Sequence, residues 1–347
     1  MSDAADHSAL HCAACAGQCH YAPDRRALEC LSCGEVYDLA TPDDHLAAQE
    51  FPHDPNQTDD DPPILNTAQG HQCRNCGGEV MFTGPALSEA CPYCNGPMVL
   101  HNGDAGYGTM ALVPFQVTVA QAQGAVHRWA TSRIAAPGDL GGIVAQASVA
   151  GLYAPFWTFD SREALEYWAR YTSGSGDNRR THSTKGRMDV VFDDLLMPAS
   201  PHVTPLIRDG ILHDFDPGAL RPYRAGYLSG FAAERHHQSV AQGLVANAPD
   251  KDLLIRNKIK QKVAKRGVHS IRYLTDTTGI HYRRILLPVW ILHYTYGGRA
   301  KKIVVSGIDG RTYGERPFSI WRMAAYSAAF TAAAMALGVF WGAAGLL

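Results

Sequence analysis

The strongest constraint on this chain is a cysteine pattern that occurs twice near its N-terminus. Eight of the nine cysteines form Cys-x-x-Cys pairs, and 14 residues separate the two pairs of each module. The first module consists of Cys12, Cys15, Cys30 and Cys33, and the second of Cys73, Cys76, Cys91 and Cys94. Two such pairs, brought together by a hairpin, supply the four tetrahedral sulfur ligands that structural zinc requires. The sequence therefore predicts two zinc ribbons, each holding one Zn²⁺ ion.

Redox dithiols and an iron–sulfur site are the other interpretations of paired cysteines. A redox Cys-x-x-Cys pair needs no second pair at a fixed distance, so the repeated spacing favours zinc. Each module offers four cysteines and no position for water, so we expect structural rather than catalytic zinc. Cys19 is left over and is expected to be a free thiol. Residues 1–20 contain no apolar signal segment, so we expect the cysteine-rich part to stay in the reducing cytosol.

The composition divides the 347 residues into five segments. Residues 41–69 contain many acids and prolines but no Lys or Arg, which predicts an extended linker. The predicted order is zinc ribbon 1 (1–40), the acidic Pro-rich linker (41–69), zinc ribbon 2 (70–101), a body domain (107–318) and a transmembrane tail (320–347). The body mixes strand and helix patterns, so the expected fold class is α+β with antiparallel strands.

Within the body, the pattern predicts a helix over residues 120–133 and a hairpin tip at 173–180. Residues 151–171 favour strands with a turn near 160–163. Helical segments are expected over 201–266, broken by Pro217, Pro222 and Pro249. Two Pro-x-Trp segments, 153–159 and 287–294, resemble each other. They are either a chance similarity or a duplicated hairpin that packs both tryptophans into one core.

The last 24 residues, 324–347, carry no charge. About 20 apolar residues span a bilayer as a helix, so this run predicts a membrane span. The alternative is a buried Ala-rich core helix. Arg311, Arg316 and Arg322 precede the run, and the positive-inside rule then places the preceding domains in the cytoplasm. We therefore expect a single-pass, tail-anchored protein.

A basic run precedes the last strands, with isoleucine or valine at every fourth position. It consists of Arg256, Lys258, Lys260, Lys262, Lys265 and Arg266. This run is typical of an amphipathic helix that either contacts anionic lipid headgroups or exposes a solvated face. The formal net charge of −2 disfavours a chain that is coated in positive charge for nucleic acid.

No catalytic residue can be assigned from the sequence. It contains no Gly-x-x-x-x-Gly-Lys-Ser/Thr, His-Glu-x-x-His or Gly-x-Ser-x-Gly motif. Asp193 and Asp194 are adjacent, and neighbouring residues of a strand point to opposite faces. We therefore expect that the protein is not an enzyme, with an unrecognised enzyme in the body domain as an alternative.

Four segments together resemble a family. They are the second ribbon (CRNCGGEVMFTGPALSEACPYCNGPMV), YAPFWTFD at 153–160, YLSGFAAER at 227–235 and LLPVW at 286–290. In this order, over roughly residues 70–345, they resemble bacterial membrane-anchored zinc-ribbon proteins. These are often described as TFIIB-type zinc-ribbon or primosomal protein N′ (PriA)-like proteins. This chain differs by its additional N-terminal ribbon and by having only one clear span.

The resemblance implies a protein of the inner (cytoplasmic) membrane without known catalysis. It also implies SPFH/flotillin-like or phage-shock-type partners in envelope stress. We therefore expect a non-catalytic, membrane-anchored adaptor that presents cytosolic protein-docking modules. The alternative is a zinc-ribbon protein that binds nucleic acid without helicase activity. Against it, module two carries only Arg74 between its outer cysteines, opposed by Glu79 and Glu89, and ribbons that bind nucleic acid are usually basic.

Overall fold

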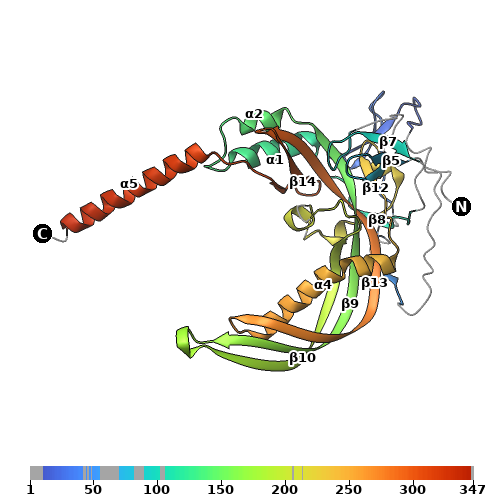
Figure 1. Cartoon of the computed structure of the whole chain (residues 1–347). Coiled ribbons are helices and arrows are strands. Elements are labelled where there is room, and N and C mark those ends of the chain that lie inside the picture. The colour runs from blue at the N-terminus through green and yellow to red at the C-terminus, as the bar shows by residue number, and fades with distance from the viewer. Residues whose placement is uncertain are drawn as a thin grey trace.

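The computed structural model describes most of the chain. It describes residues 11–41, 44, 47, 49–54, 70–81, 90–101, 106–204, 207–212 and 214–344. The architecture is mixed α+β with largely antiparallel sheets and one long C-terminal helix, as expected for the fold class (Figure 1). Most of the predicted linker lies outside the described residues. Two of its described residues, Phe51–Pro52, form the short strand β4, which pairs with residues 281–282.

The strands form two sheets. A small antiparallel sheet has the order β1-β2-β3, from Cys19–Ala22, Ala27–Cys30 and Val36–Asp38. The main path of the large sheet runs β11-β8-β13-β9-β12-β6-β5-β7, with β10 on β9, β14 on β13, and β15 on β14. Its members are β4 (Phe51–Pro52), which pairs with β13, and β5 (Gly70–Cys73), β6 (Glu79–Met81), β7 (Met98–His101), β8 (Ala111–Leu112), β9 (Val149–Ser173), β10 (Arg180–Pro198), β11 (Arg221–Pro222), β12 (Ala232–Glu234), β13 (Val268–Tyr296), β14 (Arg299–Ser306) and β15 (Thr312–Gly314).

Three very long strands organise the molecule. They are β10, β9 and β13, which lie side by side in this order. β9 pairs in antiparallel orientation with both of its neighbours. The predicted turn near 160–163 is wrong, because β9 passes through it without a break. Two of the polar residues that suggested a turn are buried instead: Ser161 donates a 2.9 Å hydrogen bond to Glu163, and Lys251 lies 2.5 Å from the same carboxylate. Polar residues in a strand can therefore reflect a buried ion pair rather than a loop.

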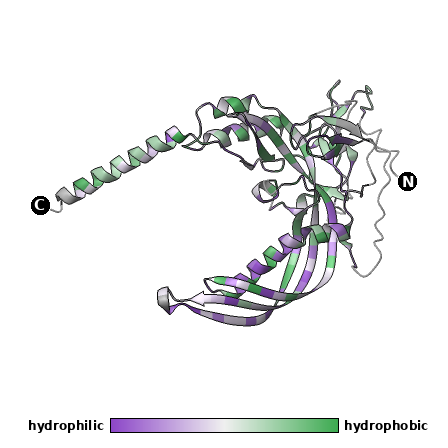
Figure 2. Cartoon of the chain, in the orientation of Figure 1, coloured by the Kyte–Doolittle hydropathy of each residue, from purple (hydrophilic) through white to green (hydrophobic). Residues whose placement is uncertain are grey.

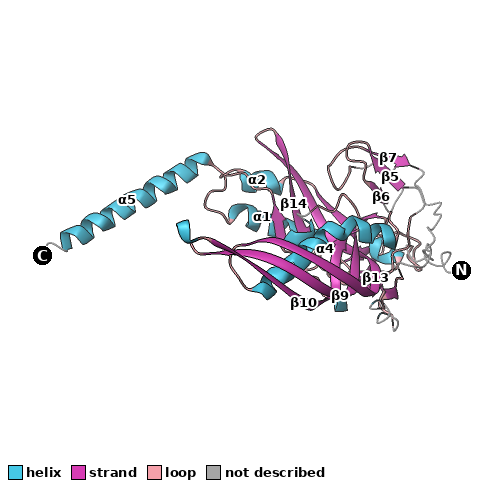
Figure 3. Cartoon of the chain, turned by 60° about the horizontal axis from the view of Figure 1, so that its bottom comes forward, coloured by secondary structure: helices cyan, strands magenta, loops and turns pink. Residues whose placement is uncertain are grey.

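The outer halves of β9, β10 and β13, with α4 (Val240–Val263) packed on one face, form a curved arm (Figure 3). Leu165, Tyr167 and Ala169 of β9 contact Ile255 and Ile259 of α4 in the interior of this arm. The side chain of Ser239 caps α4 in a capping box.

The expectation that Pro249 would break the helical region is wrong, because α4 continues through it. Proline has no N–H for the carbonyl of residue 245, one turn earlier. Val245 is 77% exposed, so water can satisfy that carbonyl and the break is not forced.

The apolar interior of the body divides into neighbouring clusters. Phe115 stacks on Phe231 with ring centroids 4.1 Å apart, and Trp290 lies against both rings. Trp157 belongs to another cluster, stacked on Phe159 at 5.4 Å. A duplicated hairpin that packs both tryptophans into one core is therefore not what the chain forms: the two Pro-x-Trp segments lie on β9 and β13, which pair directly with each other.

The remaining helices lie around this sheet. α1 (Val119–Thr131) confirms the helix predicted over 120–133, and α2 (Leu140–Ala145) packs beside it. Short helical turns are η3 (Gly176–Asn178), η4 (Arg208–Leu212), η5 (Pro217–Ala219) and η6 (Ala225–Leu228). η3 lies at the predicted hairpin tip.

The last helix, α5 (Ile320–Ala344), projects away from the body (Figure 1). Residues Ile320–Trp341 have a mean hydropathy of 1.6 and none of this stretch is buried in the described chain. Figure 2 shows predominantly apolar colour along α5. The helix is therefore long and apolar enough to cross a membrane, and within the described chain it is not a buried core helix.

Candidate metal centres

All four Cys-x-x-Cys turns fold in the same way. In each turn, the N–H four residues after the first cysteine donates to that cysteine's carbonyl at 2.7–2.9 Å. The first cysteine's own N–H donates to the carbonyl of the residue five positions after it, at 2.8–2.9 Å. The residues four positions after the first cysteine all have positive φ: they are Ala16, Gly34, Gly77 and Asn95. Because this conformation suits Gly and Asn, three of the four positions match it in sequence, and only Ala16 does not.

The turns bring the eight predicted cysteines into two groups. Cluster 1 contains Cys12, Cys15, Cys30 and Cys33, and cluster 2 contains Cys73, Cys76, Cys91 and Cys94, with ligand atoms within 4.8 Å of one another in each. The closest sulfur–sulfur contacts are 3.4–3.5 Å in cluster 1 and 3.5–3.7 Å in cluster 2. In a tetrahedral site with metal–sulfur bonds of about 2.3 Å, the sulfurs lie about 3.8 Å apart. Both clusters therefore fit a four-sulfur metal site.

Cluster 1 lies on its own small sheet and is partly open. Cys15 and Cys33 are exposed, whereas Cys12 and Cys30 are buried. The hydroxyl of Tyr37 lies 3.1 Å from the sulfur of Cys12, and this hydrogen bond lowers the pKa of the Cys12 thiol to about 6. A thiolate is the form that binds a metal, so Tyr37 favours ligation at Cys12.

Cluster 1 packs against the body near η6, where Tyr21, Leu28 and Leu39 share a buried core with Tyr227, Leu228 and Phe231. The hydroxyl of Ser229 donates to the carbonyl of Cys19 at 2.6 Å, and the rings of Tyr21 and Tyr227 meet edge to face at 5.4 Å. Cys19 is buried at the start of β1, and burial raises the pKa of its thiol. Cys19 belongs to neither four-cysteine group.

Cluster 2 is built into the large sheet. Its strand β6 pairs with β12, so that Val80 lies opposite Glu234 and Met81 opposite Ala233. Tyr93, between the last two ligands, reaches into the body and donates a hydrogen bond to Glu234. The hydroxyl of Ser200 donates to the other oxygen of Glu234 at 2.6 Å.

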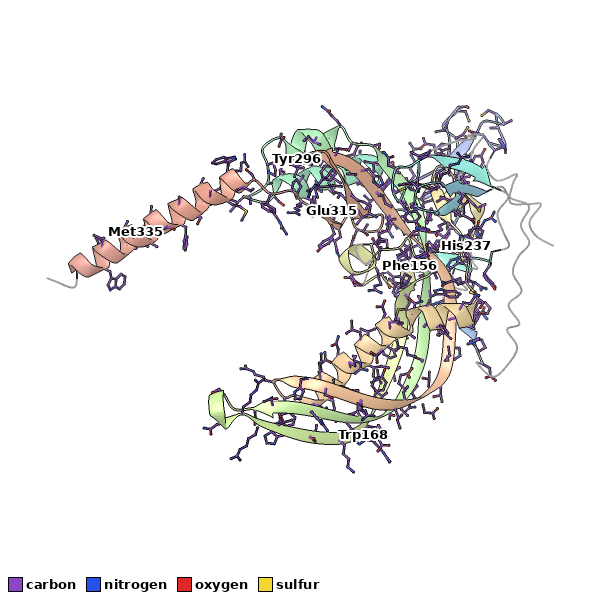
Figure 4. The ribbon with its side chains drawn as sticks, in the orientation of Figure 1. Phe156, Trp168, His237, Tyr296, Glu315 and Met335 are labelled. Atoms are coloured by element: carbon purple, nitrogen blue, oxygen red, sulfur yellow. The ribbon has the colours of Figure 1, made fainter. Side chains whose placement is uncertain are left out.

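Several titratable residues lie around this contact, and Glu234 is buried. Burial raises the pKa of Glu234 to about 7. Burial also lowers the pKa of Lys302, although the nearby cysteines oppose that shift. His237, labelled in Figure 4, lies 3.9 Å from Glu79 beside the same cluster. The sequence carries one signal for this contact: the last turn of cluster 2 reads Cys-Pro-Tyr-Cys, and no other turn of the four contains an aromatic residue.

A third group of potential ligands was not predicted. Carboxylate oxygens of Glu50, Asp160 and Asp194 lie within 4.8 Å of one another. The buried guanidinium of Arg283 lies between them, bonded to Asp194 and 3.3 Å from Glu50. Burial and the neighbouring Asp160 raise the pKa of Glu50 to about 6. Arg283 pairs with two of these three acids, so this group is at least in part an ion-pair network.

The predicted basic run occupies the outer end of α4 and the loop after it. Lys258, Lys260, Lys262, Lys265 and Arg266 are exposed. Arg256 is different: its guanidinium donates to Asp252 and to the carbonyl of Ile271, each at 2.7 Å. Arg256 therefore ties α4 to β13, whereas the other five side chains face solvent.

Comparisons with known proteins give one relative. No protein-family model and no solved structure matches the chain. The uncharacterized protein YdjG of Bacillus subtilis (strain 168) is 23% identical over 237 residues, which cover 62% of this chain and 65% of the relative. The chain thus matches just under two thirds of that protein's length.

Proposed function

We propose that this protein is a membrane-anchored zinc-ribbon adaptor, and that it is not an enzyme. The observation that carries the proposal is the bipolar layout in Figure 1: α5 extends from one end of the molecule, and both cysteine clusters lie at the other. Such a layout suits a protein that holds docking modules away from a bilayer. The order of the four segments that resemble this family supports placing it among the bacterial membrane-anchored zinc-ribbon proteins, with SPFH/flotillin-like or phage-shock-type assemblies as partners.

Zinc is the metal that best fits both clusters. Four cysteines without an oxygen or nitrogen ligand favour zinc or an iron–sulfur cluster, and the sulfur spacing suits a single tetrahedral ion. Four sulfurs leave no coordination position for water or substrate, so each ion would have a structural role. Elemental analysis of the purified chain should give two zinc ions per molecule. Cys12→Ser/Cys15→Ser should leave one zinc ion, and iron in place of zinc would contradict the assignment.

The membrane span is proposed for α5, with the domains before it in the cytoplasm. Its apolar surface is unburied, and exposing that much apolar surface to water is costly. The base of α5 is held by Arg322, whose guanidinium donates to the carbonyl of Ala136 at 2.8 Å. Arg322 also provides a positive charge at the cytoplasmic end of the span.

Carbonate extraction of membranes tests the anchor. The full chain should stay in the membrane pellet, and a chain that ends at residue 319 should move to the soluble fraction. Since none of Ile320–Trp341 is buried in the body, the truncation removes little packing from the described fold. A full chain that is released by carbonate would refute the span.

Crosslinking in intact membranes, followed by purification in mild detergent, tests the adaptor role. The full chain should capture a defined set of membrane-associated proteins. Cys12→Ser/Cys15→Ser should lose part of that set while the large sheet stays folded, because the strands of cluster 1 form a sheet of their own. Cys19→Ser is the matched control, and identical partner sets in all three proteins would count against cluster 1 as a docking module.

A further inference from the structure

The end of the arm concentrates positive charge. We define the arm tip as the part beyond the strand row of Gly186, Tyr167 and Tyr273, which pair across β10, β9 and β13. It comprises residues 167–186 and 257–273 and contains ten Lys or Arg residues but only one acid, Asp177. The basic residues are Arg170, Arg179, Arg180, Lys185, Lys258, Lys260, Lys262, Lys265, Arg266 and Arg272. This short region has a formal net charge of +9 in a chain whose net charge is −2.

The charges of the arm tip are not used within the fold. All ten side chains are exposed. Among the side chains that the structure describes, none of the ten makes an ion pair with an acid. Nearer the body the pattern changes, because Arg187 pairs with Glu166 at 3.8 Å and Arg162 with Asp189 at 3.6 Å. The positive excess therefore begins at the arm tip.

The repulsion among these positive charges destabilises the arm, and the contacts that hold the arm together do not require them. The arm is held together by apolar contacts between β9 and α4, which need no lysine. Crowded like charges repel one another and destabilise the compact state. Lys260 and Lys262 also lie favourably at the C-terminal end of α4, but this accounts for two residues of ten. The remaining charge indicates an anionic surface as the ligand.

The position of the arm tip indicates which anionic surface. In Figures 1 and 3, the arm tip and α5 extend to the same side of the molecule, away from both cysteine clusters. The base of α5 is also basic, with Arg316 lying 3.8 Å above the ring of Trp129. Exposed apolar side chains surround that base: Ile134 is 67%, Phe318 63% and Trp321 86% exposed. Aromatic and basic residues together are typical of the membrane interface.

We infer that the arm tip binds the anionic headgroups of the same bilayer that α5 spans, as a second and electrostatic attachment. The inference rests on the proposed function, because α5 brings the arm tip to a bilayer. Each Lys or Arg near an anionic surface strengthens binding roughly fivefold. On the outer face of the arm, Trp168 is 40% exposed between Lys185 and Arg272 (Figure 4) and provides an amphipathic ring beside the charges.

Hydrogen exchange of the full chain in nanodiscs tests the inference. One set of nanodiscs contains only phosphatidylcholine, and the other also contains phosphatidylglycerol. Amides of the exposed loops at 174–180 and 264–267 should exchange at least fivefold more slowly on the anionic discs. This protection should disappear at high salt, because salt screens exposed charges. Co-elution of the chain with both kinds of disc reports insertion of α5 separately.

Two triple variants complete the test. Arg179→Gln/Arg180→Gln/Arg266→Gln should lose the lipid-dependent protection. The matched control, Arg25→Gln/Arg26→Gln/Arg74→Gln, removes three exposed arginines at the cysteine-cluster end and should keep it. Insertion of α5 without protection on anionic discs would overturn the inference alone, and failure to insert would overturn the proposed function as well. Protection of the same loops by an oligonucleotide, but not by anionic discs, would replace the bilayer with nucleic acid.

Discussion

Clusters 1 and 2 are equal in their ligand spacing and different in their attachment. Both use the same turns, with the same backbone hydrogen bonds and four cysteine sulfurs in close contact. Cluster 1 has a sheet of its own and rests on the body through side-chain contacts such as that between Tyr21 and Tyr227. Cluster 2 shares the large sheet through β6 and β12, and Tyr93 fixes it to the buried carboxylate of Glu234.

Two cysteine modules with the same spacing in the sequence can therefore have different roles in the fold. The strands of cluster 1 form a sheet separate from the large one, so we expect loss of cluster 1 to disturb the large sheet less than loss of cluster 2. In cluster 2, loss of the fold would leave Glu234 buried without the hydroxyl of Tyr93, which is costly in a dry interior. Cluster 2 is therefore part of the body, and cluster 1 is the more independent unit.

The largest effect should come from removing ligands. We expect Cys73→Ser/Cys76→Ser to lower the free energy of unfolding of the body by at least about 4 kcal/mol, because metal binding is folding free energy and β6 then loses its support. Cys12→Ser/Cys15→Ser should cost the body about 2 kcal/mol or less. Denaturant titration in detergent, followed by the fluorescence of the buried Trp157 and Trp290, measures both. Equal losses would show that the two clusters are attached equally.

The next effect concerns pH. Glu234 has its pKa raised by burial from 4.5 to about 7 in the folded chain. Between these values the folded chain holds a proton that the unfolded chain has released, so raising the pH lowers the free energy of unfolding. Glu234→Gln removes this dependence. Relative to wild type, the variant should gain about 2 kcal/mol between pH 5.5 and pH 8.

Denaturant titrations at pH 5.5, 6.5, 7.5 and 8, at a constant free zinc concentration, check this prediction. Tyr21→Phe is the matched control, since it alters the contact of cluster 1 without removing an acid. Its stability relative to wild type should not change over this range. A Glu234→Gln difference that is also constant with pH would show that Glu234 does not titrate in the folded chain.

The two four-cysteine groups could be predicted from the sequence because their assembly depends on local spacing. All eight cysteines meet as expected, since each Cys-x-x-Cys turn is closed by its own backbone hydrogen bonds. The contact between Tyr93 and Glu234 could not be predicted, because 141 residues separate its partners and only the folded sheet brings them together. The group of Glu50, Asp160 and Asp194 near Arg283 could not be predicted for the same reason, because the three acids come from distant segments.

The fold class could be predicted, but the lengths of the elements could not. The helix over 120–133 has a strong local pattern and a capping box at Thr118, and it forms as expected. In β9 and α4, tertiary structure overrides local signals. Lys251 compensates the buried Glu163, so the strand continues, and the exposed Val245 lets α4 tolerate Pro249.

A smaller effect should appear in metal release. Cys15 and Cys33 of cluster 1 are exposed, whereas the outer ligands of cluster 2, Cys76 and Cys94, are half-buried. A chelator should therefore remove zinc in two phases, with the phase from cluster 1 at least about tenfold faster. A colorimetric chelator assay measures both rates. The fast phase should be missing in Cys12→Ser/Cys15→Ser, and a single phase in the wild type would argue against unequal access.

The smallest expected effect tests the contact between cluster 1 and the body alone. A Cβ at Gly226 would lie 2.8 Å from Leu39 and 3.2 Å from Leu28, both on the cluster 1 side. Gly226→Ala should push these flexible side chains away and weaken the contact by about 1 kcal/mol. Hydrogen exchange in β1–β3 should then speed up about fivefold, while the large sheet keeps its protection. Gly142→Ala is the control, because its Cβ would meet nothing within 4 Å. If the large sheet loses protection together with β1–β3, cluster 1 is no more independent of the body than cluster 2.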